Sequence, residues 1–355
     1  MPEFSIIMAY MDGKNSFRRR NLFAVIDRCL SLFPEEAIVV AEQGKSSVSE
    51  KLDTYNPRLI HVTVEDGKRF HKTKLLNTAV DEAPGNYIVM IDADAYLDEV
   101  AAKSIYDSVE RLKNEVPLKT ALIYPFDSVD YLTEGQTRDL LAGNPVNSKF
   151  CDHGVHIQRQ TGLCNIFEKC CWKAVRGFDE EFYEWGAEDD AFAYKLKRLI
   201  GKVVRVPGHV YHLFHQKVDN ETYIKSSVYL NNRKMCACIR RMTGDDFDEY
   251  REGHVSLAEL VDKYDKMRRL SVRLEWQCTP TTVLTIDSTI YDMGPEAELD
   301  ITKVLETVMG EDGPAYMPVF VHEVFDPVPD LSDSQKEEIR VFLERAAKLA
   351  EETKA

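Results

Sequence analysis

Two aspartates stand two residues apart at the end of an apolar stretch, in the segment MIDADAY, as Asp92 and Asp94. Side chains two apart in a strand point the same way, so both carboxylates should emerge from the sheet together. Two such carboxylates repel each other unless a positive charge lies between them. Mg²⁺ and Mn²⁺ suit that need because they prefer oxygen ligands and keep positions for water or substrate phosphates. The D-x-D pair therefore predicts a metal-bridged diphosphate, against the alternative of a simple turn cap.

Two histidines follow in the segment VYHLFH, as His212 and His215, with His209 just before them. Imidazole is a frequent ligand for manganese and related ions. Taken alone, these would be ordinary, partly buried histidines. Because the same chain also supplies the aspartate pair, we expect histidines of this group to complete the metal shell from the opposite side. The sequence leaves open which of the three bind the metal.

A run of carboxylates begins a helical pattern in GFDEEFYEWGAEDDAFAYKLKR, residues 177–198. Acidic residues in the first turn of a helix complement its dipole, which accounts for one or two of them. The neighbouring rings of Phe182, Tyr183 and Trp185 are better suited to packing on a sugar, or on a loop that closes over one, than to facing water. A carboxylate beside such rings can accept the proton of an attacking hydroxyl.

The elements that must position these residues alternate between strands and helices. Such alternation predicts an α/β fold with a mostly parallel sheet flanked by helices, in which ligands bind at the carboxyl ends of the strands. The polar strand ends Tyr10, Glu42, Asp66 and Asp92 should therefore converge. Strands are expected at 4–10, 37–44, 59–66 and 86–97, with an arginine-rich helix after the first strand and a helix at 72–83.

The pattern changes near Gly244 to an acidic region, with a helix expected at 256–270, strands at 271–278 and 282–290, and a final helix at 332–354. We therefore expect a catalytic domain at 1–243 and a smaller, acidic α+β accessory domain at 244–355. The net charge is −15, and 26 acidic against 12 basic residues beyond Thr243 account for nearly all of it. This balance argues against a generic binder of nucleic-acid backbone, which needs lysine and arginine.

The cysteines and the lengths of the apolar runs indicate the cellular compartment. Eight cysteines lack the paired C-x-x-C spacing of a zinc site, which predicts reduced thiols. The longest apolar runs are much shorter than a membrane helix, and no basic leader with a cleavage site precedes them. A cytoplasmic protein without a membrane span is the expectation.

Four motifs in one order carry a resemblance to a known family. They are FHKTKLLN (70–77), IDADA, GFDEEFYEWGAEDDAF and VYHLFH. Over roughly residues 4 to 240 the chain resembles the metal-dependent GT-A glycosyltransferases. The resemblance is closest to the beta-1,4-galactosyltransferase-like group and its relatives among bacterial chondroitin-type polymerases. It implies the Rossmann-like GT-A sheet and a nucleoside-diphosphate sugar as donor.

The same resemblance implies roles for individual residues. Asp94 falls on a ligand of Mn²⁺ (or Mg²⁺), His215 on the family's metal-binding histidine, and His212 where some members place a methionine ligand. Asp189 matches the general base, and Glu188 matches a residue that holds substrate hydroxyls.

The donor site follows in the same way. Asp190 matches a second hydroxyl-binding residue, Asp92 lies near the donor's ribose and the metal, and Trp185 matches the tryptophan whose loop closes over the sugar nucleotide. An insertion in the first loop leaves the choice between Arg18 and Arg19 open. Four further residues lie where family members contact uridine and diphosphate: Tyr10, Arg18, Glu42 and Lys74.

The chain departs from the family pattern at two places, and the resemblance therefore does not predict the donor sugar or the acceptor. The family's second glycine-rich turn is only partly present around Gly162, and Glu184 stands where a glycine usually precedes the tryptophan.

These inferences predict an inverting glycosyltransferase that moves a sugar from a UDP-sugar to an acceptor hydroxyl by in-line displacement. The acceptor is expected to be a glycan, a protein or a hydroxymethylated DNA base. One alternative is a sugar-phosphate nucleotidyltransferase, although the sequence lacks a clear glycine-rich phosphate loop near the amino terminus. The other is an inactive sugar-nucleotide-binding adaptor. The acidic terminal domain is also compatible with an interface in a homo-oligomer.

Overall fold

The computed structural model describes the greater part of the chain. It divides the chain into two compact units, Met1–Leu257 and Ala258–Ala355. None of the described helices is long and apolar enough to cross a membrane. The described residues are 2–12, 16–46, 48–67, 69–146, 155–156, 161–216, 223–265, 268–279, 282–293 and 319–323.

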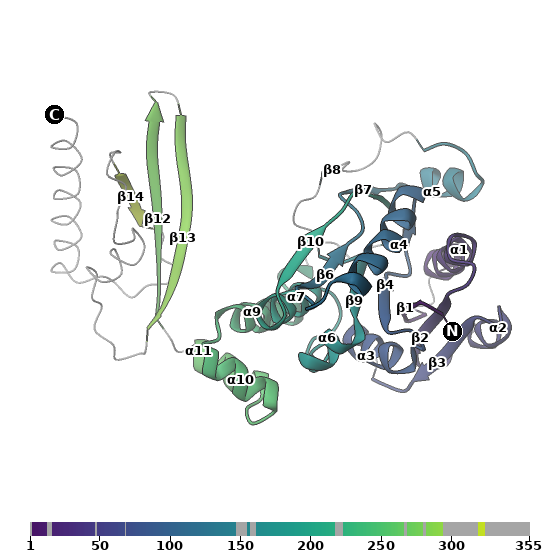
Figure 1. The fold of residues 1–355 in the computed structure, drawn as a ribbon, viewed down its shortest axis with the longest axis horizontal. Coiled ribbons are helices and arrows are strands. Elements are labelled where there is room, and N and C mark those ends of the chain that lie inside the picture. The colour runs from purple at the N-terminus through teal and green to yellow at the C-terminus, as the bar shows by residue number, and fades with distance from the viewer. Residues whose placement is uncertain are drawn as a thin grey trace. The chain divides into compact units, whose positions relative to one another are not determined.

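The first unit is built on a seven-stranded sheet with the order β10-β6-β9-β4-β1-β2-β3 (Figure 1). The β3-β2-β1-β4 ladder and the β10-β6 pair are parallel, and β9 runs antiparallel to both of its neighbours. The prediction of an α/β fold with a mostly parallel sheet flanked by helices is confirmed. The strands are β1 Phe4–Tyr10, β2 Ala37–Gln43, β3 Leu59–Val64, β4 Tyr87–Ile91, β6 Thr120–Tyr124, β9 Cys164–Glu168 and β10 Lys202–Arg205.

Helices lie on both faces of this sheet (Figure 1). Their ends follow local chemistry: Asp98 caps one helix by accepting a hydrogen bond from the Ala101 amide, and Thr133 forms a capping box with Gln136. The helices of the first unit are α1 Ser16–Leu32, α2 Ser49–Thr54, α3 Lys72–Glu82, α4 Glu99–Asn114, α5 Glu134–Leu141, α6 Lys169–Ala174, α7 Glu188–Leu199, α9 Ser227–Arg241 and α10 Gly244–Glu252. Helix α11 Leu257–Asp265 begins at the last residue of this unit and continues into the second unit.

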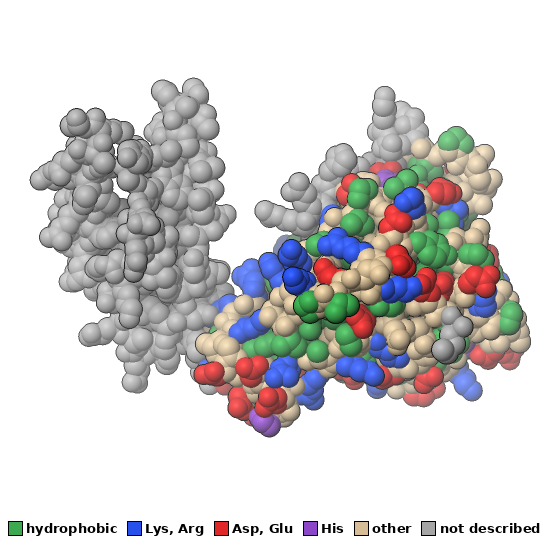
Figure 2. Space-filling model, viewed as in Figure 1, with side chains coloured by type: hydrophobic (Ala, Val, Ile, Leu, Met, Phe, Trp, Pro, Cys, Tyr) green, Lys and Arg blue, Asp and Glu red, His purple; other side chains and the backbone are tan. Residues whose placement is uncertain are grey.

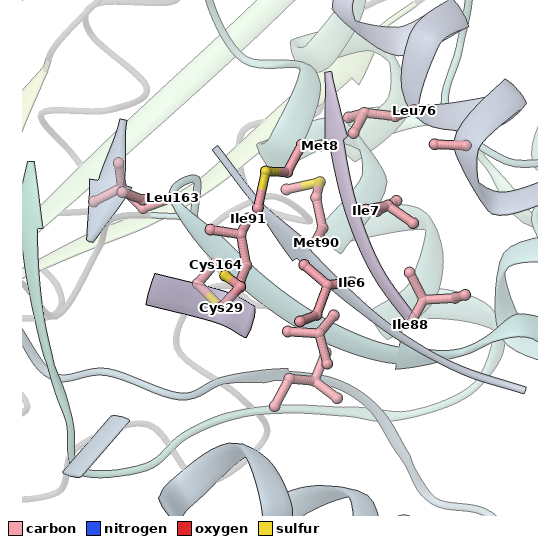
Figure 3. Packing of buried hydrophobic residues seen from close by; sticks show 14 of the residues in the cluster. Ile6, Ile7, Met8, Cys29, Leu76, Ile88, Met90, Ile91, Leu163 and Cys164 are labelled. Carbon is pink, nitrogen blue, oxygen red and sulfur yellow. The ribbon is translucent and has the colours of Figure 1, made fainter. Parts of the chain in front are cut away.

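The core of the unit lies between the sheet and these helices, as Figure 3 shows for part of it. Ile6 and Met8 on β1 and Met90 on β4 are inaccessible to solvent. Full burial of such side chains stabilises the fold by about 1.5–3 kcal/mol each. Cys29 on α1 and Cys164 on β9 are free thiols in this core, and burial raises the pKa of Cys29 to about 12.

A second, four-stranded sheet has the order β5-β11-β7-β8. Within it β5 pairs antiparallel with β11, which places His212 opposite Ala95. The prediction of one continuous strand at 86–97 is wrong, because the chain turns at residues 92–94 and leaves the large sheet for the small one. Asp92 and Asp94 therefore lie in a turn and contact different partners. The strands are β5 Ala95–Leu97, β7 Ser128–Tyr131, β8 Val155–His156 and β11 His209–His212.

The second unit contains a three-stranded antiparallel sheet with the order β13-β12-β14. The strands predicted at 271–278 and 282–290 lie within β12 and β13. The helix predicted at 256–270 ends earlier, at Asp265, because the chain from Arg268 onward pairs as a strand. The helix predicted at 332–354 lies outside the described residues. The strands are β12 Arg268–Thr279, β13 Thr282–Met293 and β14 Val319–Glu323.

The first unit ends later than the domain boundary expected at 243/244. Helix α10 belongs to it because Arg198 on α7 donates hydrogen bonds to the Met242 and Thr243 carbonyls, and its guanidinium lies 4.5 Å from the centre of the Phe247 ring. A lysine or arginine over an aromatic face is a favourable contact. The division therefore falls after Leu257.

Candidate active site

Asp94, His212 and His215 form a cluster that we call the His–Asp cluster. Their nearest nitrogen and oxygen atoms all lie within 4.8 Å of one another. The Nε2 atom of His215 is 3.2 Å from Asp94 Oδ2, and that of His212 is 3.9 Å from Asp94 Oδ1. The backbone supports this arrangement, since the Leu213 amide donates to the Asp94 carbonyl. The turn at 92–94 and the end of β11 thus bring the three side chains together.

The electrostatics of the His–Asp cluster favour an ionised carboxylate. Burial alone would raise the pKa of Asp94, but His212, His215 and the Arg18 guanidinium hold it well below its usual range. A carboxylate oxygen with two imidazole nitrogens is a donor set that suits Mn²⁺ and other divalent transition-metal ions. The three residues leave further coordination positions for water or substrate. The donor set therefore fits the divalent metal that the sequence predicts.

His209 lies apart from the His–Asp cluster. Its Nε2 atom is 3.2 Å from Asp130 Oδ2 and its Nδ1 atom is 2.8 Å from Ser128 Oγ. A spacing of three residues within β11 places His209 and His212 on opposite faces of the strand. The choice that the sequence leaves open thus falls on His212 and His215 as the histidines beside Asp94.

Lys72, Asp92, Glu188 and Asp189 form a second group, the lysine–carboxylate cluster. The ammonium nitrogen of Lys72 is 3.1 Å from Glu188 Oε1, 3.1 Å from Asp189 Oδ2 and 3.2 Å from Asp92 Oδ1. Lys72, Glu188 and Asp189 are buried. The three carboxylates raise the pKa of Lys72 against the effect of its burial, so it remains an ammonium ion.

Sequence reasoning missed Lys72 and named Lys74 instead. Successive positions on a helix are 100° apart, so residues two apart on α3 point in nearly opposite directions. Lys74 is partly exposed, with its nitrogen 3.3 Å from Asp66 Oδ2. Asp66 and Asp92 thus both contact the first turn of α3. Lys72 is the first residue of that helix, and this position is the feature of the sequence that could have identified it as a site residue.

Asp189 is buried in the first turn of α7, where the resemblance places the general base. Burial raises the pKa of its carboxyl well above the usual range; Glu188 and Asp92 add to this, and Lys72 opposes it. Its Oδ1 atom is buried without a hydrogen-bond partner. Gly162 lies against the other oxygen, because a Cβ there would come within 2.8 Å of Asp189 Oδ2. A carboxylate with a raised pKa is suited to accept a proton near neutral pH.

The start of α7 is linked to the D-x-D turn by the segment around Gly162. Thr161 donates a 2.6 Å hydrogen bond to Asp190, and the Leu163 amide donates to Asp92 Oδ2 at 3.3 Å. Arg233 on α9 lies 3.7 Å from Asp190. The partly present glycine-rich turn around Gly162 therefore contacts both Asp190 and Asp92 and fixes their relative positions.

The aromatic residues before α7 occupy three different environments. Phe182 is buried in the core, so its ring is not available to a sugar, one of the two partners expected for these rings. Tyr183 stacks on the His71 ring at 4.2 Å. Trp185 is 60% exposed and stacks on Tyr229 at 5.6 Å. Of these three aromatics, Trp185 is the one that offers a ring face to a ligand.

Tyr223 fixes the backbone of Trp185. The Tyr223 hydroxyl donates to the Trp185 carbonyl at 2.8 Å and accepts from the Trp185 amide at 3.0 Å. These bonds hold the segment that carries the exposed indole. Sequence reasoning missed this contact, since Tyr223 lies 38 residues further along the chain.

Two of the residues expected in the nucleotide pocket, Tyr10 and Glu42, lie at the ends of β1 and β2. Tyr10 and Glu42 are paired in the parallel ladder. The Tyr10 hydroxyl donates to Asp12, and burial raises the pKa of Tyr10 well above its usual value. Arg19 forms two 2.8 Å hydrogen bonds to Asp12. The positive charge of Arg18 instead helps to lower the pKa of Asp94, which favours Arg18 over Arg19 as the cation beside the His–Asp cluster.

Glu42 is enclosed by protein groups. Its carboxylate accepts hydrogen bonds from Ser46 and from Ser49 at 2.7 Å, and it lies 2.9 Å from His61 Nε2. The residue is inaccessible to solvent. In this structure Glu42 therefore supports the end of β2 and does not present its oxygens to a ligand.

Lys195 on α7 and Asp179 form a buried ion pair that anchors the segment before the active site. The Lys195 nitrogen is 3.0 Å from Asp179 Oδ2 and donates to the Gly177 carbonyl at 2.8 Å. Lys195→Met should lower the free energy of unfolding by about 3–5 kcal/mol, because it leaves a buried carboxylate without its partner. Chemical denaturation measures this effect. The exposed neighbour Lys197→Met is the control, and an equal loss in both variants would contradict the assignment.

One known family is similar to a segment of the chain that includes part of the candidate site. A family model described as the N-terminal domain of galactosyltransferase matches residues 146–216. The matched segment contains the acidic start of α7 and both histidines of the His–Asp cluster. The match confirms the prediction of a glycosyltransferase. No curated protein sequence matches the chain significantly.

Many solved structures are similar to this chain, including the following three. The catalytic domain of Drosophila beta1,4galactosyltransferase 7, in complex with xylobiose, is 14% identical over 85% of this chain and 97% of that one, with a TM-score of 0.43. TarS 1-349 of S. aureus, in complex with UDP-GlcNAc, is 13% identical over 74% and 72%, with a TM-score of 0.46. The mannosyltransferase PcManGT of Pyrobaculum calidifontis, in complex with GDP-Man and Mn2+, is 16% identical over 74% and 72%, with a TM-score of 0.42. TM-scores below 0.5 are too low to add to the inference of function.

Proposed function

We propose that this chain, a glycosyltransferase, is a metal-dependent, inverting enzyme that moves a sugar from a UDP-sugar to an acceptor hydroxyl. The observation that supports this most is the meeting of two clusters at residues 92–94. Asp94 belongs to the His–Asp cluster, and Asp92 shares Lys72 with Asp189. A metal-binding donor set and a buried carboxylate with a raised pKa thus adjoin through one turn.

The His–Asp cluster would hold the metal ion through Asp94, His212 and His215. A divalent metal bound there supplies positive charge to the departing diphosphate. Arg18, whose charge already acts on Asp94, would contribute a second cation to the same phosphates. The first unit is then the catalytic domain.

Asp189 acts as the general base of the reaction. The acceptor oxygen forms a bond to the anomeric carbon, and its proton passes to the Asp189 carboxylate. The bond from the anomeric carbon to the diphosphate oxygen breaks, and its electron pair leaves with the nucleoside diphosphate. Because one displacement occurs on one face of the sugar, the anomeric configuration inverts. Glu188 and Asp190 flank the base and would hold substrate hydroxyls.

Trp185 supplies a ring face on which the donor sugar or a closing loop can pack. Trp185→Ala should raise the KM for the donor about 10-fold, since losing such an aromatic contact costs on the order of 1–1.5 kcal/mol. The free energy of unfolding should change by less than about 0.5 kcal/mol because the side chain is exposed. Steady-state kinetics and chemical denaturation measure the two quantities. Trp185→Phe, which keeps a ring, is the control, and an unchanged KM in Trp185→Ala would contradict this role.

The acceptor is proposed to be a cytoplasmic glycan, a protein or a hydroxymethylated DNA base. On the face of the first unit drawn in Figure 2, acidic and basic side chains are interspersed. Such a surface differs from the single-signed basic field of general nucleic-acid binders, and it favours a glycan or protein. The second unit is proposed as an accessory domain that forms a homo-oligomer or binds a basic partner.

Product stereochemistry tests the proposed reaction. The protein is incubated with Mn²⁺, a UDP-sugar and an acceptor panel, and the anomeric proton of the transferred sugar is followed by NMR. The expected product carries a configuration opposite to that of the donor. A product with retained configuration would contradict the single displacement by an Asp189-activated hydroxyl. Binding of donor without any turnover would instead favour a sugar-nucleotide-binding adaptor.

A further inference from the structure

Lys72 occupies an unusual position for a lysine, buried among three carboxylates from two other parts of the fold. Asp92 comes from the turn after β4, and Glu188 and Asp189 come from the first turn of α7. An ammonium group has three donors, and the three carboxylate oxygens lie 3.1–3.2 Å from its nitrogen. Each donor can therefore meet one carboxylate. Lys72 joins α3 to both acidic parts of the site.

The geometry fixes one oxygen of Asp189 from two directions. Lys72 contacts Oδ2, and Gly162 lies so close to the same atom that a Cβ there would come within 2.8 Å. The Gly162 backbone therefore packs close to the oxygen that Lys72 contacts. A side chain that is bonded on one side and packed on the other is held in a single orientation.

The charged groups around Asp189 include both carboxylates and an ammonium group. Glu188 on its own helix and Asp92 on the neighbouring turn carry negative charge, and the buried Tyr124 hydroxyl on β6 also lies within electrostatic reach. Lys72 on α3 is the cation in direct contact. Burial and the two carboxylates favour the protonated form of Asp189, whereas Lys72 favours the anion. The state of the base thus depends on Lys72.

We propose, building on the function proposed above, that Lys72 is the positioning residue of the general base. Its ammonium group holds the Asp189 carboxylate in place and favours its ionised form, so that it can accept the acceptor's proton. Lys72 thereby acts through Asp189 and belongs to the catalytic machinery without taking the proton itself.

The pH dependence of kcat/KM for the acceptor tests this role. In Lys72→Met the acidic limb of the profile should move to higher pH by about 1 to 3 pH units, because the charge that favours the anion is lost. Activity that is low at neutral pH should therefore recover at higher pH. Lys72→Arg keeps the charge and should leave the limb close to that of the parent. A limb that stays in place in Lys72→Met overturns the proposal.

A second variant keeps the test valid if Lys72→Met does not fold. Glu188→Gln removes one negative charge beside Asp189 and keeps an oxygen that can accept from the Gly186 amide. Its acidic limb should move to lower pH, opposite to that of Lys72→Met. An unchanged limb, or one that moves to higher pH, would show that these charges do not govern the base. Donor affinity is measured by calorimetry in parallel, and a loss of donor binding with an unmoved limb would make Lys72 a donor ligand instead.

A readout without turnover separates this inference from the proposed function. Carboxyl-carbon NMR of protein labelled at aspartate follows the titration of Asp189 directly, with Asp189→Asn identifying its signal. Absence of any transferase activity would contradict the proposed function. The titration of Asp189 should still move to higher pH in Lys72→Met, and an unmoved titration would overturn the role of Lys72 by itself.

Discussion

Asp189→Asn is expected to lower kcat by about 10²–10⁴-fold, the range that a positioned general base contributes. The amide cannot accept the acceptor's proton, whereas its oxygen can still accept a hydrogen bond from Lys72. Donor affinity should be nearly unchanged, because the lost function belongs to the transition state. Steady-state rates at saturating donor and calorimetry of donor binding measure the two effects.

The folding of Asp189→Asn supplies an internal control. The lysine–carboxylate cluster holds three carboxylates against one ammonium group, so removing one negative charge reduces repulsion. The free energy of unfolding should therefore not fall. Asp190→Asn is the contrast variant. Asp190 accepts a hydrogen bond from Thr161 and lies 3.7 Å from Arg233, so this substitution should change the donor KM more than kcat. A kcat for Asp189→Asn within threefold of the parent would rule out Asp189 as the base.

His215→Ala and Asp94→Ala are expected to weaken Mn²⁺ binding by at least about 100-fold, since each removes one of the three side chains proposed to hold the metal. Activity should fall by about 10²–10³-fold, because charge stabilisation at the diphosphate is worth several kcal/mol. Electron paramagnetic resonance of free Mn²⁺ measures binding without any need for turnover. Removal of the metal by a chelator should reproduce the activity loss in the parent protein.

His209→Ala is the matched control for the His–Asp cluster. His209 lies three residues from His212 on the same strand, but its nitrogens contact Ser128 and Asp130. Mn²⁺ affinity should stay within about twofold of the parent in this variant, since no ligand is removed. Equal losses in His209→Ala and His215→Ala would mean that the strand, and not the cluster, was disturbed.

The alternation of strand and helix could be predicted from the sequence because it depends on local patterns. Buried residues of β1, β2 and β4 occur in continuous apolar runs, which is typical of a parallel sheet covered on both faces. The break after Ile91 could not be predicted in this way. Apolar residues continue on both sides of it, and the two pieces pair with different strands distant in the sequence.

The candidate site was predictable where a motif fixes the order of its residues. The segments around Asp94 and His215 are distant in sequence, and their meeting follows from the ordered motifs and from the β5-β11 pairing. Lys72 was missed because two lysines stand two apart in one motif, and only the direction of α3 decides which one faces the carboxylates. Phe182 was assigned to a ligand surface because composition does not reveal which aromatic is buried.

The most direct test of the central proposal is release of nucleoside diphosphate from a panel of sugar nucleotides with Mn²⁺, with and without chelator. We expect turnover of one donor in the parent protein, its loss on chelation, and its loss in both Asp94→Ala and Asp189→Asn. Turnover that survives the chelator or either substitution would contradict a metal-dependent transfer carried out by these two groups.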